Sequence, residues 1–372
     1  MPIKHIKITN VMAFQNHWRK NNGDFESAPL TNGDRIHDAF ELGFSDGINV
    51  IIGENGTGKT TLLKMIYAAT QWSLEQVDIR KASKFHNIFS ANIADVDPLK
   101  NHSSKDAYCG FEVSDGDHTF SYSLTHKGMF NVCNWSDINI PSVFIPTTEM
   151  LSHSKGFLAL NEKFRMPFDQ TQVDIIVNAS LPEARSLPDY MSAILDKLSA
   201  AIDGTVIQEN DVFYVVKNDG QKIDFSLEAE GLRKLALIWK LIRNGLLENG
   251  TVLLWDEPEA NLNPELFPLV AGILLELQKN GIQIFIATHS YNFAKYLELL
   301  RTEKETVLFH NLFKSNRNLP DELSDVLPGH EDNCSMICSK SEFSMEDLHP
   351  NHLMLADEKL LDMVYEEKVN GK

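Results

Sequence analysis

The chain contains no run of about 18 consecutive apolar residues, the length that a membrane-spanning helix needs. It also has no apolar signal-peptide segment at its start, where Met1–Ile8 alternates charged and apolar residues. Its four cysteines, Cys109, Cys133, Cys334 and Cys338, fit reduced thiols better than a disulfide framework. These absences predict a cytoplasmic protein that does not enter a membrane.

Basic side chains are also in short supply. The 372 residues include 34 Lys and Arg against 52 Asp and Glu, which gives a net charge of −18. A broad sequence-independent nucleic-acid surface needs clustered Lys and Arg, so this balance argues against one. The charge balance does not exclude a local basic groove that forms on dimerisation. His330, Cys334 and Cys338 are spaced by four residues, but without a second Cys/His pair they predict a solvated loop rather than a zinc site.

Apolar residues are plentiful enough for a large core. At 43% hydrophobic and 23% charged residues, the chain fits two domains or one large α/β unit. Residues 15–35 and 318–350 are predicted to be loops. The other predicted elements are strands at 3–12, 39–42 and 48–52, hairpins across 108–134 that turn at 115–116 and 127–128, helices over 147–204, a hairpin of 206–216 with 222–227, a helix over 231–242, a strand at 251–255, a helix from 264 to 280, and a strand at 282–287.

The most specific motif lies between a β-branched strand pattern and a helical pattern. Gly53, Gly58, Lys59 and Thr60 occupy the fixed positions of G-x-x-x-x-G-K-[ST], the P-loop. Glycines let backbone N–H groups turn towards phosphate oxygens, and the following helix directs its positive end at the same anion. We expect Lys59 to reach the β- and γ-phosphates and Thr60 to bind Mg²⁺. The predicted nucleotide-binding residues of this loop are Gly53, Asn55, Gly56, Thr57, Gly58, Lys59, Thr60 and Thr61.

Two carboxylates follow the apolar strand at 251–255. Asp256 is predicted to hold Mg²⁺, and Glu257 to orient and polarise the attacking water. His289 follows the next strand, where it could contact the γ-phosphate and respond to its loss, although a lone histidine is often structural. All three follow strand carboxyl ends, the place where ligands bind in parallel sheets. The sequence therefore predicts an ATPase that uses ATP and Mg²⁺.

These segments resemble ABC-type ATPases. The resemblance covers residues 1–312 and rests on the P-loop, on Leu-Leu-Trp-Asp-Glu-Pro, on the Asn261–Asn263 loop and on Ala-Thr-His-Ser. It is strongest to the soluble branch that includes SMC proteins, RecF and OLD proteins, and in particular to small prokaryotic AAA-type ATP-binding proteins of the OLD-like group. It implies an α/β P-loop NTPase fold, with a mixed sheet, an antiparallel β-subdomain and an inserted helical subdomain.

The resemblance also implies four segments. Residues 1–149 would form ATP-binding lobe I with the antiparallel β-subdomain, and 150–230 the helical insertion and a hairpin. Residues 231–312 would form lobe II, with the metal-binding strand end and His289. Residues 313–372 would be an acidic tail of unknown role.

In such ATPases two subunits sandwich ATP, and a signature loop of one caps the γ-phosphate held by the other. The corresponding stretch here is Ser226–Lys234, so Gly231 and Asn261 are expected to act across a homodimer. Ala229 replaces the usual serine, which leaves Ser226, Arg233 or Lys234 as substitutes. Glu149 stands where a glutamine is usual and is a third expected catalytic residue, with Glu257 and His289.

The implied function is a dimeric ATP-driven switch that controls a separate effector, a nuclease or a toxin, in antiphage defence. No heptad arm separates Lys59 from Asp256, and residues 313–372 are too short for the Toprim nuclease domain of OLD proteins. One alternative is a RecF- or SMC-like DNA-repair ATPase that binds DNA. Others are a transporter subunit, whose signature should read Leu-Ser-Gly-Gly-Gln, and a scaffold that hydrolyses ATP slowly or not at all.

Overall fold

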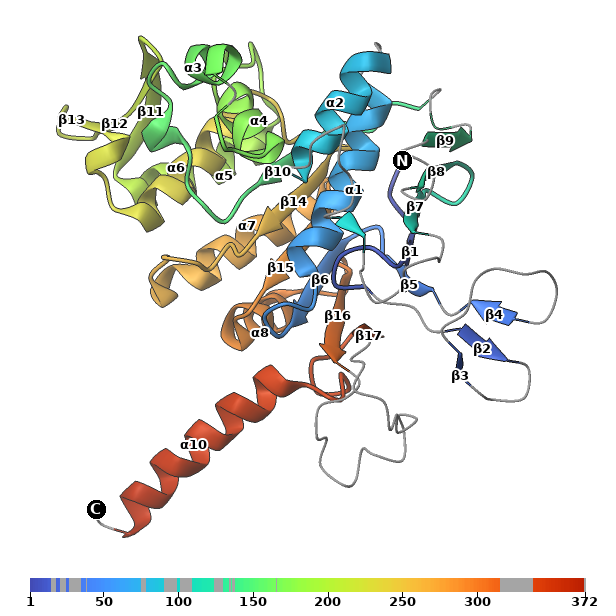
Figure 1. The fold of residues 1–372 in the computed structure, drawn as a ribbon. Helices are drawn as coiled ribbons and strands as arrows, with labels where there is room; N and C mark the ends of the chain where they lie inside the picture. The colour runs from blue at the N-terminus through green and yellow to red at the C-terminus, as the bar shows by residue number, and fades with distance from the viewer. Residues whose placement is uncertain are drawn as a thin grey trace.

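The computed structural model describes residues 1–14, 18–20, 25–26, 35–37, 39–74, 78–89, 99–100, 109–123, 130–133, 135, 138–164, 166–314 and 337–370. At its centre lies a six-stranded sheet with the order β10-β14-β15-β6-β16-β17 (Figure 1). In chain order its strands are β6 (Ile48–Gly53), β10 (Ser142–Ile145), β14 (Val252–Asp256), β15 (Gln283–Thr288), β16 (Val307–Lys314) and β17 (Ile337–Glu342). Every pairing is parallel except that of β17, which runs antiparallel to β16. The carboxyl ends of β6, β14 and β15 therefore meet at one edge.

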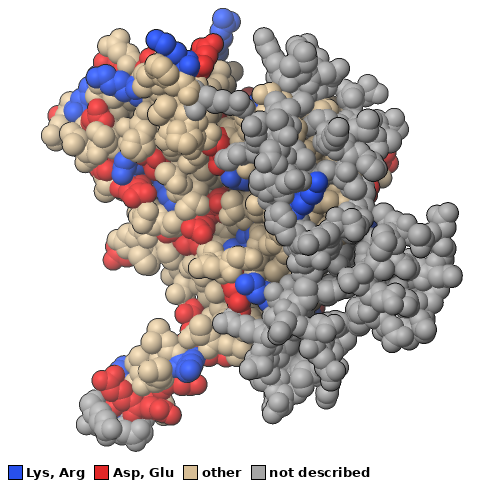
Figure 2. All heavy atoms as spheres, in the orientation of Figure 1, with Lys and Arg blue, Asp and Glu red and all other residues tan. Residues whose placement is uncertain are grey.

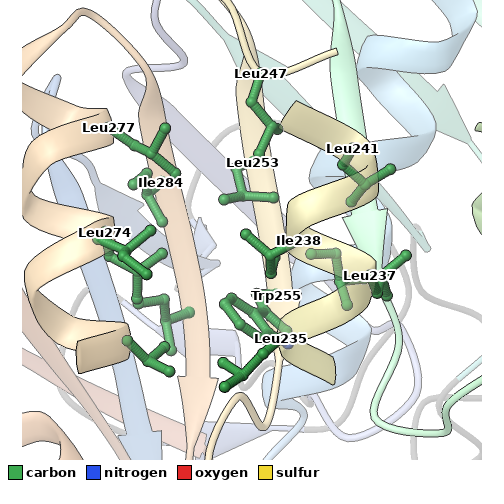
Figure 3. Close-up of a cluster of buried hydrophobic side chains, with 14 of the residues drawn as sticks. Leu235, Leu237, Ile238, Leu241, Leu247, Leu253, Trp255, Leu274, Leu277 and Ile284 are labelled. Atoms are coloured by element: carbon green, nitrogen blue, oxygen red, sulfur yellow. The ribbon is translucent and has the colours of Figure 1, made fainter. Parts of the chain in front are cut away.

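The central sheet is buried on both faces, because alternate residues of its strands enter two separate cores. Leu253 and Trp255 of β14 belong to one core, whereas Val252 and Leu254 belong to the other. The first core is covered by α6 (Glu230–Arg243), α7 (Phe267–Lys279) and α8 (Tyr291–Leu300). Figure 3 shows side chains of α6 and α7 pointing at this face of β14 and β15. Burial on both faces explains why the strands read as continuous apolar runs.

The opposite face of the sheet is covered by α1 (Lys59–Leu74) and by an antiparallel sheet of order β5-β1-β7-β8-β9. The helix α2 (Asp78–Ile88) contributes to the same core. The strands are β1 (His5–Thr9), β5 (Phe40–Gly43), β7 (Gly110–Ser114), β8 (Thr119–Ser123) and β9 (Phe130–Cys133). The predicted hairpin turn at 115–116 is confirmed. The turn predicted at 127–128 lies outside the described residues.

A helical region between β10 and α6 packs beside the sheet (Figure 1). It contains η3 (Leu151–His153), α3 (Phe157–Phe164), α4 (Gln170–Ala179), α5 (Asp189–Ile202), β11 (Gly204–Glu209), β12 (Val212–Lys217), β13 (Lys222–Asp224) and η4 (Phe225–Leu227). Two polar contacts join α4 to the P-loop helix α1. Lys64 Nζ lies 2.8 Å from Asp169 Oδ2, and the Tyr67 hydroxyl donates to Asp174 at 2.7 Å.

The predicted hairpin of 206–216 with 222–227 is confirmed in part, because β12 pairs antiparallel with β13 across the turn at 218–221. Its first arm, however, was predicted wrongly. Residues 206–216 are not one strand but two, β11 and β12, which pair with each other in an antiparallel hairpin. Asn210 and Asp211 form its turn, and both have positive φ angles, 50° and 63°. Asn and Asp adopt this left-handed conformation more readily than most residues, so the dipeptide was the signal that marked the turn.

Two predicted loops contain strands instead. Residues 15–35 overlap β2 (Trp18–Lys20), β3 (Phe25–Glu26) and β4 (Arg35–His37), which pair in the order β3-β2-β4. Strands of two or three residues are too short to show an alternating pattern. Residues 318–350 overlap β17, which places Cys338 on a strand rather than in the predicted solvated loop. His330 and Cys334 lie outside the described residues.

The last helix, α10 (His352–Asn370), leaves the body of the molecule and projects into solvent (Figure 1). Its first residue stays close to the P-loop, with His352 Nε2 lying 3.8 Å from the Glu54 carboxylate. Among the described residues, no helix combines the length and the apolar character that crossing a membrane requires.

Candidate functional site

The P-loop backbone can be built only with glycine at two positions. Gly53 has φ +147°, and a Cβ there would lie 2.2 Å from the Leu312 carbonyl oxygen of the neighbouring strand β16. Gly58 has φ +89°, and its Cβ would lie 2.8 Å from the ring of Phe14. The loop ends where α1 begins, at Lys59, so its last residues adjoin a helix N-terminus. This is the backbone arrangement that binds phosphate groups.

Lys59 is buried beneath the loop that precedes it. Its ammonium donates to the carbonyl oxygens of Gly53 at 2.8 Å and Glu54 at 2.9 Å. Burial lowers the pKa of Lys59 to about 8, although the carboxylates of Glu257, Asp256 and Glu259 favour its charged form. The Lys59 ammonium is therefore already partly desolvated in the folded protein, so this cost is not added when an anion binds.

Asp256 ends β14 and meets two hydroxyl groups. Thr60 Oγ1 lies 3.1 and 3.0 Å from the two carboxylate oxygens, and Thr147 Oγ1 donates to Oδ2 at 3.0 Å. Burial raises the pKa of Asp256, and both hydroxyl contacts oppose that shift. A hydroxyl beside a carboxylate supplies the hard oxygen ligands that Mg²⁺ prefers, so Thr60 and Asp256 fit this ion.

Sequence reasoning missed Thr147. It follows β10, which pairs with β14 in parallel, so the ends of the two strands lie side by side. A polar residue just after an apolar strand was the available signal.

Glu257 and His289 form a contact at the ends of β14 and β15. His289 Nε2 lies 3.3 Å from Glu257 Oε1, and His289 Nδ1 lies 3.3 Å from the Lys59 ammonium. Burial, and secondly the Lys59 charge, lower the pKa of His289. The imidazole is therefore neutral at pH 7. An Nδ1 that accepts from an ammonium and an Nε2–H that donates to a carboxylate define one tautomer.

A third carboxylate, that of Glu259, also escaped the sequence analysis. Its Oε1 accepts from the Thr288 hydroxyl at 2.6 Å and from the His289 backbone N–H at 3.0 Å. Burial raises the pKa of Glu259. This side chain fixes the strand end that carries His289. The signal was the sequence Asp-Glu-Pro-Glu itself, which places a further acid two residues beyond Glu257.

Gly231 and Asn261 lie against each other within one chain. A Cβ on Gly231, in the first turn of α6, would lie 2.8 Å from the Asn261 carbonyl oxygen. The Asn261 side chain donates to Glu230 at 2.8 Å, and its own backbone is left-handed, with φ 60°. The start of α6 and the Asn261–Asn263 loop thus form one continuous surface. A side chain at position 231 would disturb this contact before it met any second subunit.

The three residues considered as substitutes for the missing serine at position 229 have partners in their own chain. They are Ser226, whose hydroxyl donates to Asp224 at 2.8 Å, Arg233, which lies 3.2 Å from Glu149, and Lys234, which donates to the Glu257 carbonyl at 3.1 Å.

Glu149 is buried after β10, and its carboxylate has structural partners. It accepts from the backbone N–H groups of Leu151 and Ser152 and pairs with Arg233 of α6. Its contacts within the described part of the chain include neither Asp256 nor Glu257. The catalytic role of Glu149 stays a prediction.

No cluster of three or more His, Cys, Asp or Glu that could hold a metal occurs among the described residues.

Comparison with known proteins identifies the family. A family model described as "AAA domain, putative AbiEii toxin, Type IV TA system" matches residues 72–294, more than half of the chain. The chain belongs to this family. One curated relative, the arginine transport ATP-binding protein ArtP of Haemophilus influenzae, is 44% identical over 54 residues, or 14% of this chain. The match spans only 22% of that relative's length.

A solved structure supports the same fold. An SMC head bound to the C-terminal winged-helix domain of ScpA has a TM-score of 0.50 and 13% identity, over 93% of this chain and 99% of the other. The SMC head domain of Thermotoga maritima covers 91% of this chain and 99% of its own, with a TM-score of 0.45 and 15% identity. The predicted fold, a P-loop NTPase with a mixed α/β sheet, is confirmed, and the protein is an ATPase.

The pKa of Lys59 predicts how ATP binding depends on pH. Below pH 8 the ammonium is charged before ATP arrives, whereas above pH 8 it must first take up a proton. Affinity is therefore fully present below the free-state pKa and declines as pH rises through it. Between pH 7.5 and 9 the Kd of ATP with Mg²⁺ should rise about eightfold. Equilibrium titration with a fluorescent ATP analogue measures it.

Lys59→Arg is the control for this measurement, because guanidinium keeps its proton over the same range. The Kd of this variant should change less between pH 7.5 and 9. A wild-type Kd that stays constant would refute the role assigned to the Lys59 proton.

Proposed function

We propose that the chain is an ATP-hydrolysing dimeric switch of the OLD-like branch, and that it controls a separate effector protein, a nuclease or a toxin, in antiphage defence. The observation that carries the ATPase part is the cluster around Lys59. There the Lys59 ammonium lies 3.3 Å from His289, which lies 3.3 Å from Glu257. The neighbouring residue Thr60 lies 3.1 Å from Asp256, the residue before Glu257.

In this proposal the residues divide the work of binding. Lys59 exchanges the Gly53 and Glu54 carbonyls for the β- and γ-phosphates, which are better partners for an ammonium. Thr60 and Asp256 hold Mg²⁺, which neutralises charge on the same phosphates when bound. Thr147 keeps the Asp256 carboxylate in place.

Glu257 and His289 act on the reaction itself. The Glu257 carboxylate accepts a proton from water while the water oxygen bonds to the γ-phosphorus. The bond from that phosphorus to the bridging oxygen breaks, and ADP leaves with its electron pair. Neutral His289, held by the Glu259 contact to its backbone, offers a hydrogen bond to the γ-phosphate and changes partner once phosphate departs.

The dimeric part of the proposal rests on the surface formed by α6 and the Asn261–Asn263 loop. Leu227 ends η4, three residues before α6 begins, and its apolar side chain is 80% exposed. Gly231 lies four residues further on. A second copy that brings its P-loop to this surface would bury Leu227 and place backbone N–H groups of α6 beside the γ-phosphate.

A protein effector is favoured over DNA by charge and by family. The chain carries a net charge of −18, and Lys and Arg are interspersed with Asp and Glu on the described surface in Figure 2. The family description names a putative toxin of a toxin–antitoxin system, which supports a role in antiphage defence.

The alternative, a RecF- or SMC-like ATPase acting on DNA, draws support from the SMC-like fold. A transporter subunit is less favoured, since the relative from a transporter matches only 54 residues.

Glu257→Gln should separate ATP binding from turnover. The amide keeps the shape of the side chain and leaves Asp256 intact, but it cannot accept the proton from water. We expect ATP affinity within about threefold of wild type and kcat reduced by at least about a hundredfold. Steady-state phosphate release and nucleotide titration measure the two quantities. Turnover at the wild-type rate would remove Glu257 from its assigned role and direct attention to His289 and Glu149.

ATP should compact the dimer, whereas ADP should not. The γ-phosphate can accept bonds from both subunits, so only ATP favours the closed form. In Glu257→Gln, small-angle scattering with ATP and Mg²⁺ should show a smaller radius of gyration per dimer than with ADP. An unchanged profile would sink the sandwich arrangement.

Two variants sharpen this test. Adding Lys59→Ala to Glu257→Gln should abolish compaction, because ATP no longer binds. Adding Leu227→Asp should abolish compaction while ATP still binds, since the side chain is exposed and its loss leaves the core unchanged. We prefer position 227 to Gly231, where any side chain meets the Asn261 carbonyl of the same chain.

The effector should bind one nucleotide state preferentially. Co-expression with the product of the adjacent gene, followed by affinity purification, should give a complex that is retained by Glu257→Gln with ATP and lost in Lys59→Ala. Retention of DNA instead, with affinity that falls steeply as salt increases, would support the alternative function.

A further inference from the structure

Lys234 is a buried cation that the proposed reaction leaves without a role. It lies on α6 and is only 2% exposed. Its ammonium donates to the backbone carbonyl oxygen of Glu257 at 3.1 Å. Burial lowers the pKa of Lys234, although the carboxylates of Glu259, Glu230, Glu257 and Asp256 favour its charged form. Placing an ammonium in an interior is costly, so this contact has to contribute something that an apolar side chain could not.

The Glu257 backbone has an unfavourable conformation that its neighbours must stabilise. Its φ angle is +51°, in the left-handed region that residues with a Cβ seldom adopt. The Glu257 N–H donates to the Ala287 carbonyl of β15 at 2.8 Å. Its carbonyl accepts from Lys234 and from the Ala260 N–H, the latter at 3.1 Å. The direction of the Glu257 carboxylate therefore depends on β15 at one end and on α6 at the other.

The first turn of α6 is joined to the same loop at a second point. Glu230 accepts from the Asn261 side chain, and Gly231 packs on the Asn261 carbonyl. Lys234 lies one helical turn further along, on the side that faces Glu257. A shift of α6 therefore moves both ends of the loop that begins at Asp256.

We propose that Lys234 is a positioning residue that transmits the position of α6 to the Glu257 carboxylate. This inference rests on the proposed function, in which a second subunit contacts the start of α6. Contact there would align Glu257 through Lys234, so that hydrolysis follows closure of the dimer. ATP binding to the P-loop does not require this link, because Lys59 and Thr60 belong to α1.

A purely structural role predicts something different. If Lys234 only balanced the surrounding carboxylates, its loss would reduce stability and weaken every function of the site together. Lys240 provides the matched control, since it lies on the same helix, is 5% exposed and pairs with Glu183 at 3.3 Å. Lys234→Met and Lys240→Met both remove a buried ammonium from α6.

The two variants should differ in kcat and not in ATP affinity. For Lys234→Met we expect kcat to fall by about tenfold to a hundredfold, the range for a lost hydrogen bond to a charged group, with the Kd of ATP within about threefold. For Lys240→Met both should stay within about twofold of wild type. An unchanged kcat in Lys234→Met, or an equal loss in Lys240→Met, overturns the proposal.

Lys234→Gln gives a second reading, and it also serves if the Met variant fails to fold. Its amide can still donate to the Glu257 carbonyl, so part of the lost kcat should return. If both variants fold and Lys234→Gln hydrolyses ATP no faster than Lys234→Met, Lys234 acts as a counter-ion and the proposal is wrong. If only Lys234→Gln folds, a kcat of about a hundredth of wild type or less leads to the same conclusion.

A double variant separates this inference from the proposed function. In a Glu257→Gln background, Lys234→Met should lower the residual turnover no further, because the group it positions is already inactive. A further loss of the same factor would show that Lys234 acts elsewhere. Wild-type turnover in Glu257→Gln would refute the proposed role of Glu257, whereas an inactive Glu257→Gln beside a fully active Lys234→Met would refute the inference alone.

Discussion

Three carboxylates lie within four residues at the end of β14, and two buried lysines on different helices lie close to them. Asp256, Glu257 and Glu259 would repel one another in a poorly solvated place if no cation were near. Lys59 comes from α1, on one face of the sheet, and Lys234 comes from α6, on the other. Because a charge is buried at tolerable cost only beside an opposite charge, both helices must end or pass at this edge of the sheet.

That requirement is met with a strained backbone. Glu257 and Asn261 are both left-handed residues that carry side chains, at φ 51° and 60°. Strain of this kind persists only where neighbours over-determine the conformation, and here the neighbours are β15 on one side and the first turns of α6 on the other. The loop between the two residues is thus shaped by a helix that is distant in sequence, which is the arrangement expected of a site whose geometry can be changed.

Much of the site could be predicted from the sequence because its chemistry is written in short motifs. The P-loop spacing and the paired carboxylates after an apolar strand each fix a backbone shape within a few residues. Thr147, Glu259 and Lys234 were not assigned these roles, because their partners are fixed by strand pairing or helix packing between segments distant in sequence. The three-stranded sheet of β2, β3 and β4, which overlaps 15–35, was missed for a different reason, since its strands are too short to carry a periodic signal.

The packing of α6 determines how a displacement at its first turn reaches the loops after β10 and β14. Side chains of α6 share one core with α4, α5 and α7 and with the faces of β14 and β15, so the helix is not free to bend locally. Closely packed cores transmit displacement as rigid bodies. Arg233, paired with Glu149, and Lys234, bound to the Glu257 carbonyl, stand side by side on this helix. A small rotation of α6 would therefore displace both the loop after β10, which contains Thr147 and Glu149, and the loop after β14, which contains Glu257. Contact at the first turn of α6 would thus align Glu257 through Lys234, whereas Lys59 and Thr60 belong to α1 and can bind ATP without this link.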